Sequence, residues 1–233
     1  MATIDPVAMY AKAVGLEVKF NTVLVEGTSD VAFFTVAAQL ERQRSGEDLF
    51  NGDFAVVAAG ERNQGGVDGL LRELVTLRQL SKTFLRADGS SPYRFLGLFD
   101  NDHAGRRALQ TAMAMDAGIV EFRDVICLCP IMNAAVGDPA AIGRAIQKDN
   151  VGFKSIDWEI EDMVAVGLAD AFLEEFPRAL KRAVASPGGH VHRELTVDGK
   201  AELLRYVRTH AIHEDLIAIV ACLRGLRFYL GVR

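Results

Sequence analysis

Carboxylates that follow two apolar runs are the side chains of this chain best suited to chemistry. Glu26 follows the apolar residues 23–25, and Asp100 and Asp102 follow the run 95–99. Both runs have the composition of buried β-strands, and each precedes a pattern typical of a helix. Because parallel strands place functional groups at their carboxyl ends, the three acids are expected to converge on one sheet edge. Converging carboxylates repel one another unless a cation neutralises them, and such oxygen ligands suit Mg²⁺ or Mn²⁺, ions of phosphoryl transfer.

The same residues resemble the motifs of the TOPRIM domain, which bacterial primases, type IA and type II topoisomerases, recombination mediator proteins and OLD-family nucleases share. In that domain a glutamate followed by glycine ends the first strand, and a D-x-D pair with a nearby glycine ends a later one. Glu26 and Gly27 fit the first motif. Asp100, Asp102 and Gly105 fit the second. The resemblance implies that these acids bind Mg²⁺ or Mn²⁺, as two ions, and that the glycines serve backbone geometry or close approach.

Further acids and a lysine extend this resemblance. An acid four residues after the glutamate recurs in TOPRIM domains, and Asp30 stands there. OLD-family domains add an acidic motif, which Glu159 and Glu161 resemble; as alternate residues of an extended segment they would face one side. Lys200 stands where it could be the OLD-family lysine that stabilises the transition-state phosphate. The resemblance thus implies metal ligands at Asp30, Glu159 and Glu161. It also implies catalytic roles for Glu26 and Lys200.

Each of these acids also has an interpretation without function. Asp100 or Asp102 could be the N-cap of the next helix, and Asp30 lies in a first helical turn, where an acid is stabilising. Glu159 and Glu161 could belong to a solvated charged surface. One cap needs one aspartate rather than a pair, and both motifs occur in the expected order. These two observations favour the metal site.

The composition bears on compartment and cofactors. No stretch of the 233 residues approaches the roughly 20 uninterrupted apolar residues that cross a bilayer. The amino terminus has no signal-peptide pattern, so we expect a cytoplasmic protein without membrane contact. The cysteines Cys127, Cys129 and Cys222 are too few for a four-cysteine zinc site and are expected to be buried thiols. His190 and His192, in a Gly-rich segment, are expected to be solvated rather than bound to zinc.

The charge bears on the partners. A formal net charge of −5 disfavours non-specific contact with phosphates, but metal-site carboxylates inflate the acidic count and bound divalent ions reverse the local sign. From Ala171 onward Lys and Arg outnumber Asp and Glu, so the C-terminal region could supply phosphate contacts. The charge therefore leaves the partner open, and the resemblance to TOPRIM nucleases implies nucleic acid, with DNA favoured over RNA.

The order of apolar runs predicts an α/β fold. Strands and helices alternate as β-α-β-α-β-α-β up to residue 129, which predicts a parallel four-stranded sheet flanked by helices, as in the Rossmann-like TOPRIM domain. We expect an N-terminal extension over 1–20, the TOPRIM domain over 21–166 and a helical C-terminal extension over 167–233. Residues 133–153 have the composition of a loop. The predicted helices of the sheet domain cover 28–43, 67–80 and 103–115, and those of the C-terminal extension cover 170–185, 199–210 and 214–228.

The resemblance implies a small metal-dependent nuclease of OLD-family type that hydrolyses phosphodiester bonds, in phage defence or DNA repair. A topoisomerase or primase needs further domains, for which the chain has no room. OLD-family nucleases commonly join an ATPase, and the chain has no G-x-x-x-x-G-K-[ST] sequence, so a separate ATPase subunit is a candidate partner. Two alternatives stay open. One is an RNA-processing TOPRIM nuclease of the ribosomal RNA maturase kind, and the other is a non-catalytic module that binds metal or a partner.

Overall fold

A four-stranded parallel sheet is the centre of the molecule. The structure is a computed structural model that describes residues 4–60, 65–132, 138–153, 156–186 and 189–232. The sheet has the strand order β2-β1-β3-β4, and its neighbouring strands are parallel throughout. The predicted α/β fold class is thus confirmed at this level. The strands are β1 (Asn21–Val25), β2 (Phe54–Ala58), β3 (Arg94–Phe99) and β4 (Val125–Cys127).

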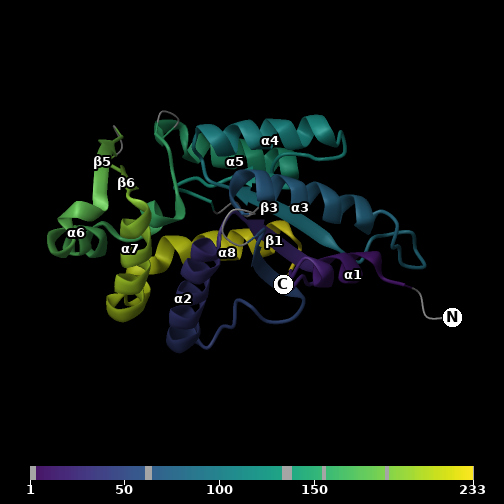
Figure 1. Cartoon of the computed structure of the whole chain (residues 1–233), viewed down its shortest axis with the longest axis horizontal. Coiled ribbons are helices and arrows are strands. Elements are labelled where there is room, and N and C mark those ends of the chain that lie inside the picture. The colour runs from purple at the N-terminus through teal and green to yellow at the C-terminus, as the bar shows by residue number, and fades with distance from the viewer. Residues whose placement is uncertain (1–3, 61–64, 133–137, 154–155, 187–188, 233) are drawn as a thin grey trace.

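Two apolar clusters form because alternate residues of a strand point to opposite faces of the sheet. Val23 and Val25 of β1 enter one cluster, whereas Leu24 enters the other. The cluster of Leu24 packs α1 (Pro6–Ala13), α3 (Gly66–Ser81) and α4 (His103–Met115). The opposite cluster packs α2 (Thr28–Ser45) and α8 (Ile217–Tyr229). Helices therefore flank the sheet on both faces (Figure 1).

The C-terminal region contains a β-hairpin as well as helices. Helix α6 (Val166–Glu175) ends before Pro177, and a 3-10 turn (Pro177–Ala179) leads into β5 (Leu180–Ala185). Strand β5 pairs antiparallel with β6 (Val191–Leu195), and this hairpin lies with α6 and α7 (Val197–His210) at one end of the molecule (Figure 1). The prediction of a helix over 170–185 was wrong beyond residue 175, because proline disfavours helical geometry in the residue before it.

Helix α5 (Pro139–Asp149) lies where the composition predicted a loop. Asp138 caps it, since its side chain accepts a hydrogen bond from the backbone N–H of Ala141, and Pro139 is in the first turn. Ile142 and Ile146, four residues apart, face the apolar cluster shared with α2 and α8. The prediction for residues 133–153 was therefore wrong for 139–149, while residues 133–137 lie outside the described ranges.

The C-terminal helix α8 shares the core of the sheet. Its apolar residues pack in the same cluster as β1 and β3. At the end of α8, the guanidinium of Arg94 in β3 donates hydrogen bonds to the carbonyls of Tyr229 and Leu230, at 3.2 and 2.7 Å. A 3-10 turn, His213–Leu216, leads into this helix. In the part of the chain that the structure describes, no helix is long and apolar enough to span a membrane.

Candidate metal site

A cavity of about 290 Å³ lies at the carboxyl edge of β1 and β3, and we call it the acidic pocket. Its described walls come from the ends of both strands, the first turn of α2, a glycine-containing loop, a 3-10 turn and α7. Segments far apart in the sequence thus converge at the edge where parallel sheets place their functional groups. The charged side chains that line the pocket are Glu26, Asp30, Asp100, Glu161 and Lys200.

Glu26 bridges the two central strands. Its Oε1 accepts a hydrogen bond of 3.1 Å from the backbone N–H of Asp100, which fixes the carboxylate of one strand against the end of the next. Burial raises the pKa of Glu26 to about 7, and the negative charges of Asp30 and Asp102 add to this increase. A carboxyl group with this pKa exchanges protons near neutral pH.

A glycine pair packs closely against Glu26. The backbone N–H of Gly66, whose φ is +70°, donates a hydrogen bond of 2.9 Å to the carbonyl of Glu26. An added Cβ at Gly65 would lie 2.9 Å from the carbonyl oxygen of Gly60 and 3.2 Å from that of Glu26. This approach therefore requires residues without side chains.

Asp30 combines a local structural role with a place in the pocket. Its Oδ2 accepts a hydrogen bond of 2.9 Å from the backbone N–H of Gly27, at the start of α2. Burial raises the pKa of Asp30 to about 6. At Gly27 itself an added Cβ would meet only ordinary contact distances, so no steric demand fixes glycine there.

The two aspartates of the D-x-D pair have different surroundings and different roles. Asp100 lines the acidic pocket, and its pKa is raised well above the ordinary value, first by burial and then by neighbouring carboxylates. Asp102 instead caps α4, because its Oδ1 accepts a hydrogen bond of 2.7 Å from the backbone N–H of Gly105. An added Cβ at Gly105 would lie 2.0 Å from the carbonyl oxygen of Asp100, so α4 packs directly on that residue.

The second acidic motif reaches the pocket through an antiparallel bridge. The backbones of Asn101 and Trp158 exchange two hydrogen bonds, of 2.9 and 3.2 Å, which bring the segment before the 3-10 turn Ile160–Met163 alongside the end of β3. The prediction of an extended segment through Glu159 and Glu161 was wrong, because Glu159 precedes this turn and Glu161 lies within it. We call residues 159–163 the acidic turn.

Both glutamates of the acidic turn nevertheless face Lys200. The Nζ atom of Lys200 lies 2.7 Å from Oε2 of Glu159 and 3.7 Å from Oε1 of Glu161. Burial raises the pKa of Glu161 to about 7, and the positive charge of Lys200 opposes that increase. Burial by itself would lower the pKa of Lys200, but these carboxylates raise it above its ordinary value. Lys200 therefore stays protonated at neutral pH.

Asp162 belongs to the predicted acidic cluster but not to the predicted metal ligands, and together with His192 of β6 it holds the acidic turn in place. Oδ2 of Asp162 accepts the backbone N–H of Glu159 at 3.0 Å and lies 2.7 Å from Nδ1 of His192, while Oδ1 accepts the backbone N–H of Arg193 at 2.8 Å. The expectation that His192 is solvated was wrong, because it is only 4% exposed. Its ring lies against the acidic turn, because both His192 and the backbone of Arg193 in β6 contact the Asp162 carboxylate.

The side chains of the acidic pocket have the oxygen atoms and the charge that a divalent cation prefers. Four carboxyl groups line the pocket and one lysine accompanies them, so ionisation of all four leaves an excess of negative charge. Oxygen ligands with such an excess favour Mg²⁺ or Mn²⁺. Within the described ranges, however, no three Asp, Glu, His or Cys side chains already have the arrangement of a formed metal site. Binding would therefore require the carboxylates to move towards the ion.

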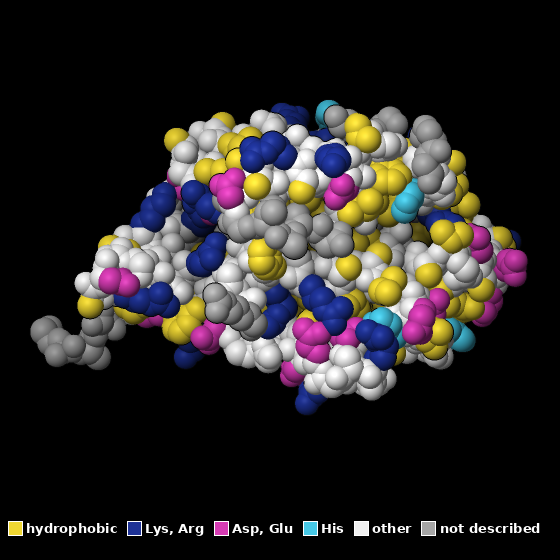
Figure 2. Space-filling view, turned by 180° about the vertical axis from the view of Figure 1, so that it is seen from behind, with side chains coloured by type: hydrophobic (Ala, Val, Ile, Leu, Met, Phe, Trp, Pro, Cys, Tyr) yellow, Lys and Arg dark blue, Asp and Glu magenta, His cyan; other side chains and the backbone are white. Residues whose placement is uncertain are grey.

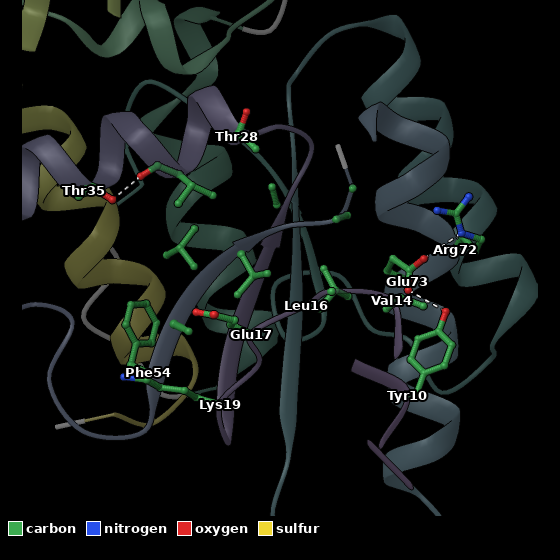
Figure 3. A pocket seen from close by; sticks show the side chains of 18 of the residues that line it. Tyr10, Val14, Leu16, Glu17, Lys19, Thr28, Thr35, Phe54, Arg72 and Glu73 are labelled. Atoms are coloured by element: carbon green, nitrogen blue, oxygen red, sulfur yellow. Dashed lines mark hydrogen bonds and ion pairs between the residues drawn. The ribbon is translucent and has the colours of Figure 1, made fainter. Parts of the chain in front are cut away.

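A larger cavity, about 1230 Å³, runs along the edge strand β2 between α1 and α2 (Figure 3). Its polar groups include pairs that already satisfy one another, such as the Tyr10 hydroxyl, which donates to Glu73 at 2.8 Å, and the Thr35 hydroxyl, which donates to the Val31 carbonyl. Among the described residues that line this groove, the acids are Glu17 and Glu73, and they form no cluster like that of the acidic pocket. On the face drawn in Figure 2, positive and negative side chains are interspersed.

The fold and the pocket define an α/β protein with a cluster of carboxyl groups at the edge of its sheet. Comparison of the chain with models of protein families, with curated proteins and with solved structures gave no match. Its functional interpretation rests on the residues of the acidic pocket and their geometry.

Proposed function

We propose that this chain is a metal-dependent nuclease of TOPRIM type, close to the OLD family, which hydrolyses phosphodiester bonds of nucleic acid, DNA in preference to RNA. The observation that carries the proposal is the convergence of the first acid, the D-x-D strand and the acidic turn with Lys200 on one pocket. These segments are separated by long stretches of sequence, and a structural role for each acid alone does not explain why they meet.

Four carboxylates of the acidic pocket would hold one or two Mg²⁺ or Mn²⁺ ions: Glu26, Asp30, Asp100 and Glu161. Asp102 and Glu159 adjoin this set; the first adds negative charge next to Glu26, and the second pairs with Lys200. When bound, such ions activate water and stabilise the leaving oxygen of an in-line phosphodiester displacement. The raised pKa values of Glu26 and Asp100 support this role, because they arise first from burial of the carboxyl groups and then from the negative charges of neighbouring carboxylates, both of which a bound cation would offset.

Glu26 is suited to act as a general base. In the metal-free chain its pKa is about 7, so it can accept a proton near neutral pH, and its Oε1 is oriented by the N–H of Asp100. In the hydrolysis the oxygen of water attacks phosphorus, and Glu26 would take the proton released by that water. The bond between phosphorus and the 3′ oxygen then breaks, and the leaving oxygen takes a proton from solvent.

Lys200 would stabilise negative charge on the phosphate. It is the cation that lines the pocket in the described part of the chain, and its ion pairs with Glu159 and Glu161 aim its ammonium group there. Occupation of the pocket by divalent ions would neutralise these glutamates and free the ammonium group for phosphate oxygens.

The proposal extends to setting and partners. A cytoplasmic nuclease with a separate ATPase subunit, in phage defence or DNA repair, agrees with the absence of a Walker-type sequence. The hairpin, α6 and α7 form one end of the molecule beside the acidic turn, and this end carries part of the basic C-terminal region (Figure 1).

The test is cleavage of plasmid DNA, single-stranded DNA and structured RNA by the purified chain, with Mg²⁺, with Mn²⁺ and with chelator. We expect DNA cleavage that needs the metal and falls by at least about 100-fold in Asp100→Asn. Asp68→Asn, which changes an exposed aspartate of α3, is the matched control and should keep full activity. Cleavage of RNA alone would support the RNA-processing alternative. Metal binding without cleavage of any substrate would support the non-catalytic module.

A further inference from the structure

A second cavity, of about 320 Å³, lies beside the acidic pocket at the carboxyl end of β4, and we call it the β4 cavity. Asn101 lines it, whereas the preceding residue, Asp100, lines the acidic pocket. Successive Cα atoms are about 3.8 Å apart, so the two cavities are immediate neighbours. Arg106 also lines the β4 cavity, and its guanidinium donates to the carbonyl and the side-chain oxygen of Asn101.

The walls of the β4 cavity are largely apolar and come from α4, α5 and the segments around them. They include Leu109, Phe122, Ile146 and Phe153. The volume is at the lower end of the range of about 300 to 1,000 Å³ that is usual for small-molecule sites. Apolar walls with a few polar groups, at this size, are suited to a planar heterocycle such as a nucleobase.

One carboxyl group in this cavity has no partner in the described part of the chain. Glu121 is half-buried and makes neither an ion pair nor a hydrogen bond through its side chain there, and burial alone raises its pKa. Its charge acts on both thiols of the cavity: after burial, it helps to raise the pKa of Cys129 to about 11 and that of Cys127 to about 12. Glu121 is therefore an acceptor for which the described residues supply no donor.

The backbone next to Glu121 is held in an uncommon conformation. Phe122 has φ +63°, which is unfavourable for a bulky residue. Two contacts maintain this conformation. The Phe122 ring packs closely on α5 at Gly143, where an added Cβ would lie 2.8 Å from the ring. The backbone N–H of Phe122 also donates a hydrogen bond to the carbonyl of Val125. Such strain persists where surrounding contacts fix it, and it is common at ligand sites.

We propose that the β4 cavity binds a guanine base, with the Glu121 carboxylate accepting its two adjacent N–H donors. On its Watson–Crick edge guanine presents N1–H and N2–H side by side, which match the two oxygens of a carboxylate. Adenine, cytosine and uracil each place an acceptor beside their donor, and a carboxylate would repel it. The link to a nucleic-acid strand rests on the proposed function: a phosphate at the acidic pocket would leave the neighbouring base beside Asn101 and the cavity.

The test is calorimetric titration of the metal-free chain with guanosine, 2′-deoxyguanosine, adenosine, cytidine and uridine. We expect the two guanine nucleosides to bind at least about tenfold more tightly than the others, because two hydrogen bonds to a charged group discriminate by that much or more. Glu121→Gln should remove this preference. Glu175→Gln, at an exposed position of α6, should keep it. Guanosine should also slow alkylation of Cys127 and Cys129, while the buried Cys222 stays unlabelled throughout.

Equal affinity for all nucleosides, or an unchanged preference in a folded Glu121→Gln variant, would overturn the proposal. The wild-type comparison decides the matter even if the variant does not fold. Nucleosides carry no phosphodiester bond and need no metal, so the outcome is separate from nuclease activity. A chain that binds guanosine selectively but cleaves nothing contradicts the proposed function alone, and a chain that cleaves DNA without guanosine binding contradicts this inference alone.

Discussion

Asp162 connects the acidic turn to the hairpin of β5 and β6, and its removal should weaken metal binding without removing a ligand. In Asp162→Asn the contact with His192 loses its charge, and Glu159 and Glu161 lose their fixed position. We expect the Mg²⁺ concentration for half-maximal cleavage to rise by about tenfold or more, as for other residues that orient metal ligands.

The matched control is Asp215→Asn. Oδ2 of Asp215 accepts the backbone N–H of Ile212 at 2.9 Å, a capping role like that of Asp162, in the turn His213–Leu216. This variant should lose similar local stability and keep the metal dependence of the wild type. If both variants responded alike to Mg²⁺, Asp162 would be a helix cap and no more.

Sequence patterns identify the residues that have a local motif and miss those that depend on the tertiary fold. Glu26 and Asp100 follow apolar runs, so their convergence could be predicted from the sequence. The pair of Asp162 and His192 joins residues thirty positions apart, and no spacing rule predicts such a contact. Glu121 gives no signal either, since its isolation depends on burial rather than on neighbouring residues.

At the scale of the elements, the packing of α4 on the end of β3 depends on Gly105. An alanine Cβ there would lie 2.0 Å from the carbonyl oxygen of Asp100, so α4 or the strand end must shift. We expect Gly105→Ala to lower the free energy of unfolding by about 1 to 3 kcal/mol, the usual effect of overpacking. The same shift should reduce cleavage, because it moves Asp100.

Gly167→Ala in the first turn of α6 is the control for that change. An added Cβ there has no atom within 4 Å, and alanine favours helix by up to about 1 kcal/mol over glycine. Urea denaturation of the two variants measures the difference. A Gly105→Ala variant as stable as Gly167→Ala would show that α4 does not press on the strand end.

The alternation of strands and helices predicted the sheet, because buried parallel strands are continuous apolar runs and their helices are amphipathic. The same method failed for α5 and β5, where composition was ambiguous. The glycines and the proline of residues 133–153 are typical of a loop, but an aspartate cap and proline in the first turn start a helix at Pro139. Strand β5 is mostly exposed, and its apolar residues do not alternate with its polar ones, so the sequence shows no period of two that would predict a strand.

For the whole molecule, the raised pKa values of the acidic pocket predict how stability depends on pH without metal. Glu26 and Glu161 have a pKa of about 7 in the folded chain, against an ordinary value of 4.5. Between these values the unfolded chain binds fewer protons, so the free energy of unfolding falls as pH rises and levels off above about pH 7. Below the ordinary pKa of about 4.5 these carboxyl groups are protonated in both the folded and the unfolded chain, so they no longer lower the free energy of unfolding.

Asp100→Asn should therefore raise the free energy of unfolding of the metal-free chain at about pH 8 by on the order of 1 kcal/mol, and flatten its decline with pH. The raised pKa of His192, caused mainly by Asp162, also makes stability fall with pH, so the difference between wild type and variant isolates the pocket. Denaturation at several pH values tests this. A variant less stable than wild type at every pH would mean that the pocket carries no excess negative charge.

The measurement that tests the central claim most directly is Mn²⁺ binding to the metal-free chain, followed by electron paramagnetic resonance at about pH 8, where the pocket carboxyls are ionised. The account predicts saturable binding by the wild type and by Asp68→Asn, with loss of that binding in Asp100→Asn and Glu26→Gln. An absence of saturable binding to the wild type, or equal binding by Asp100→Asn and the wild type, would contradict it.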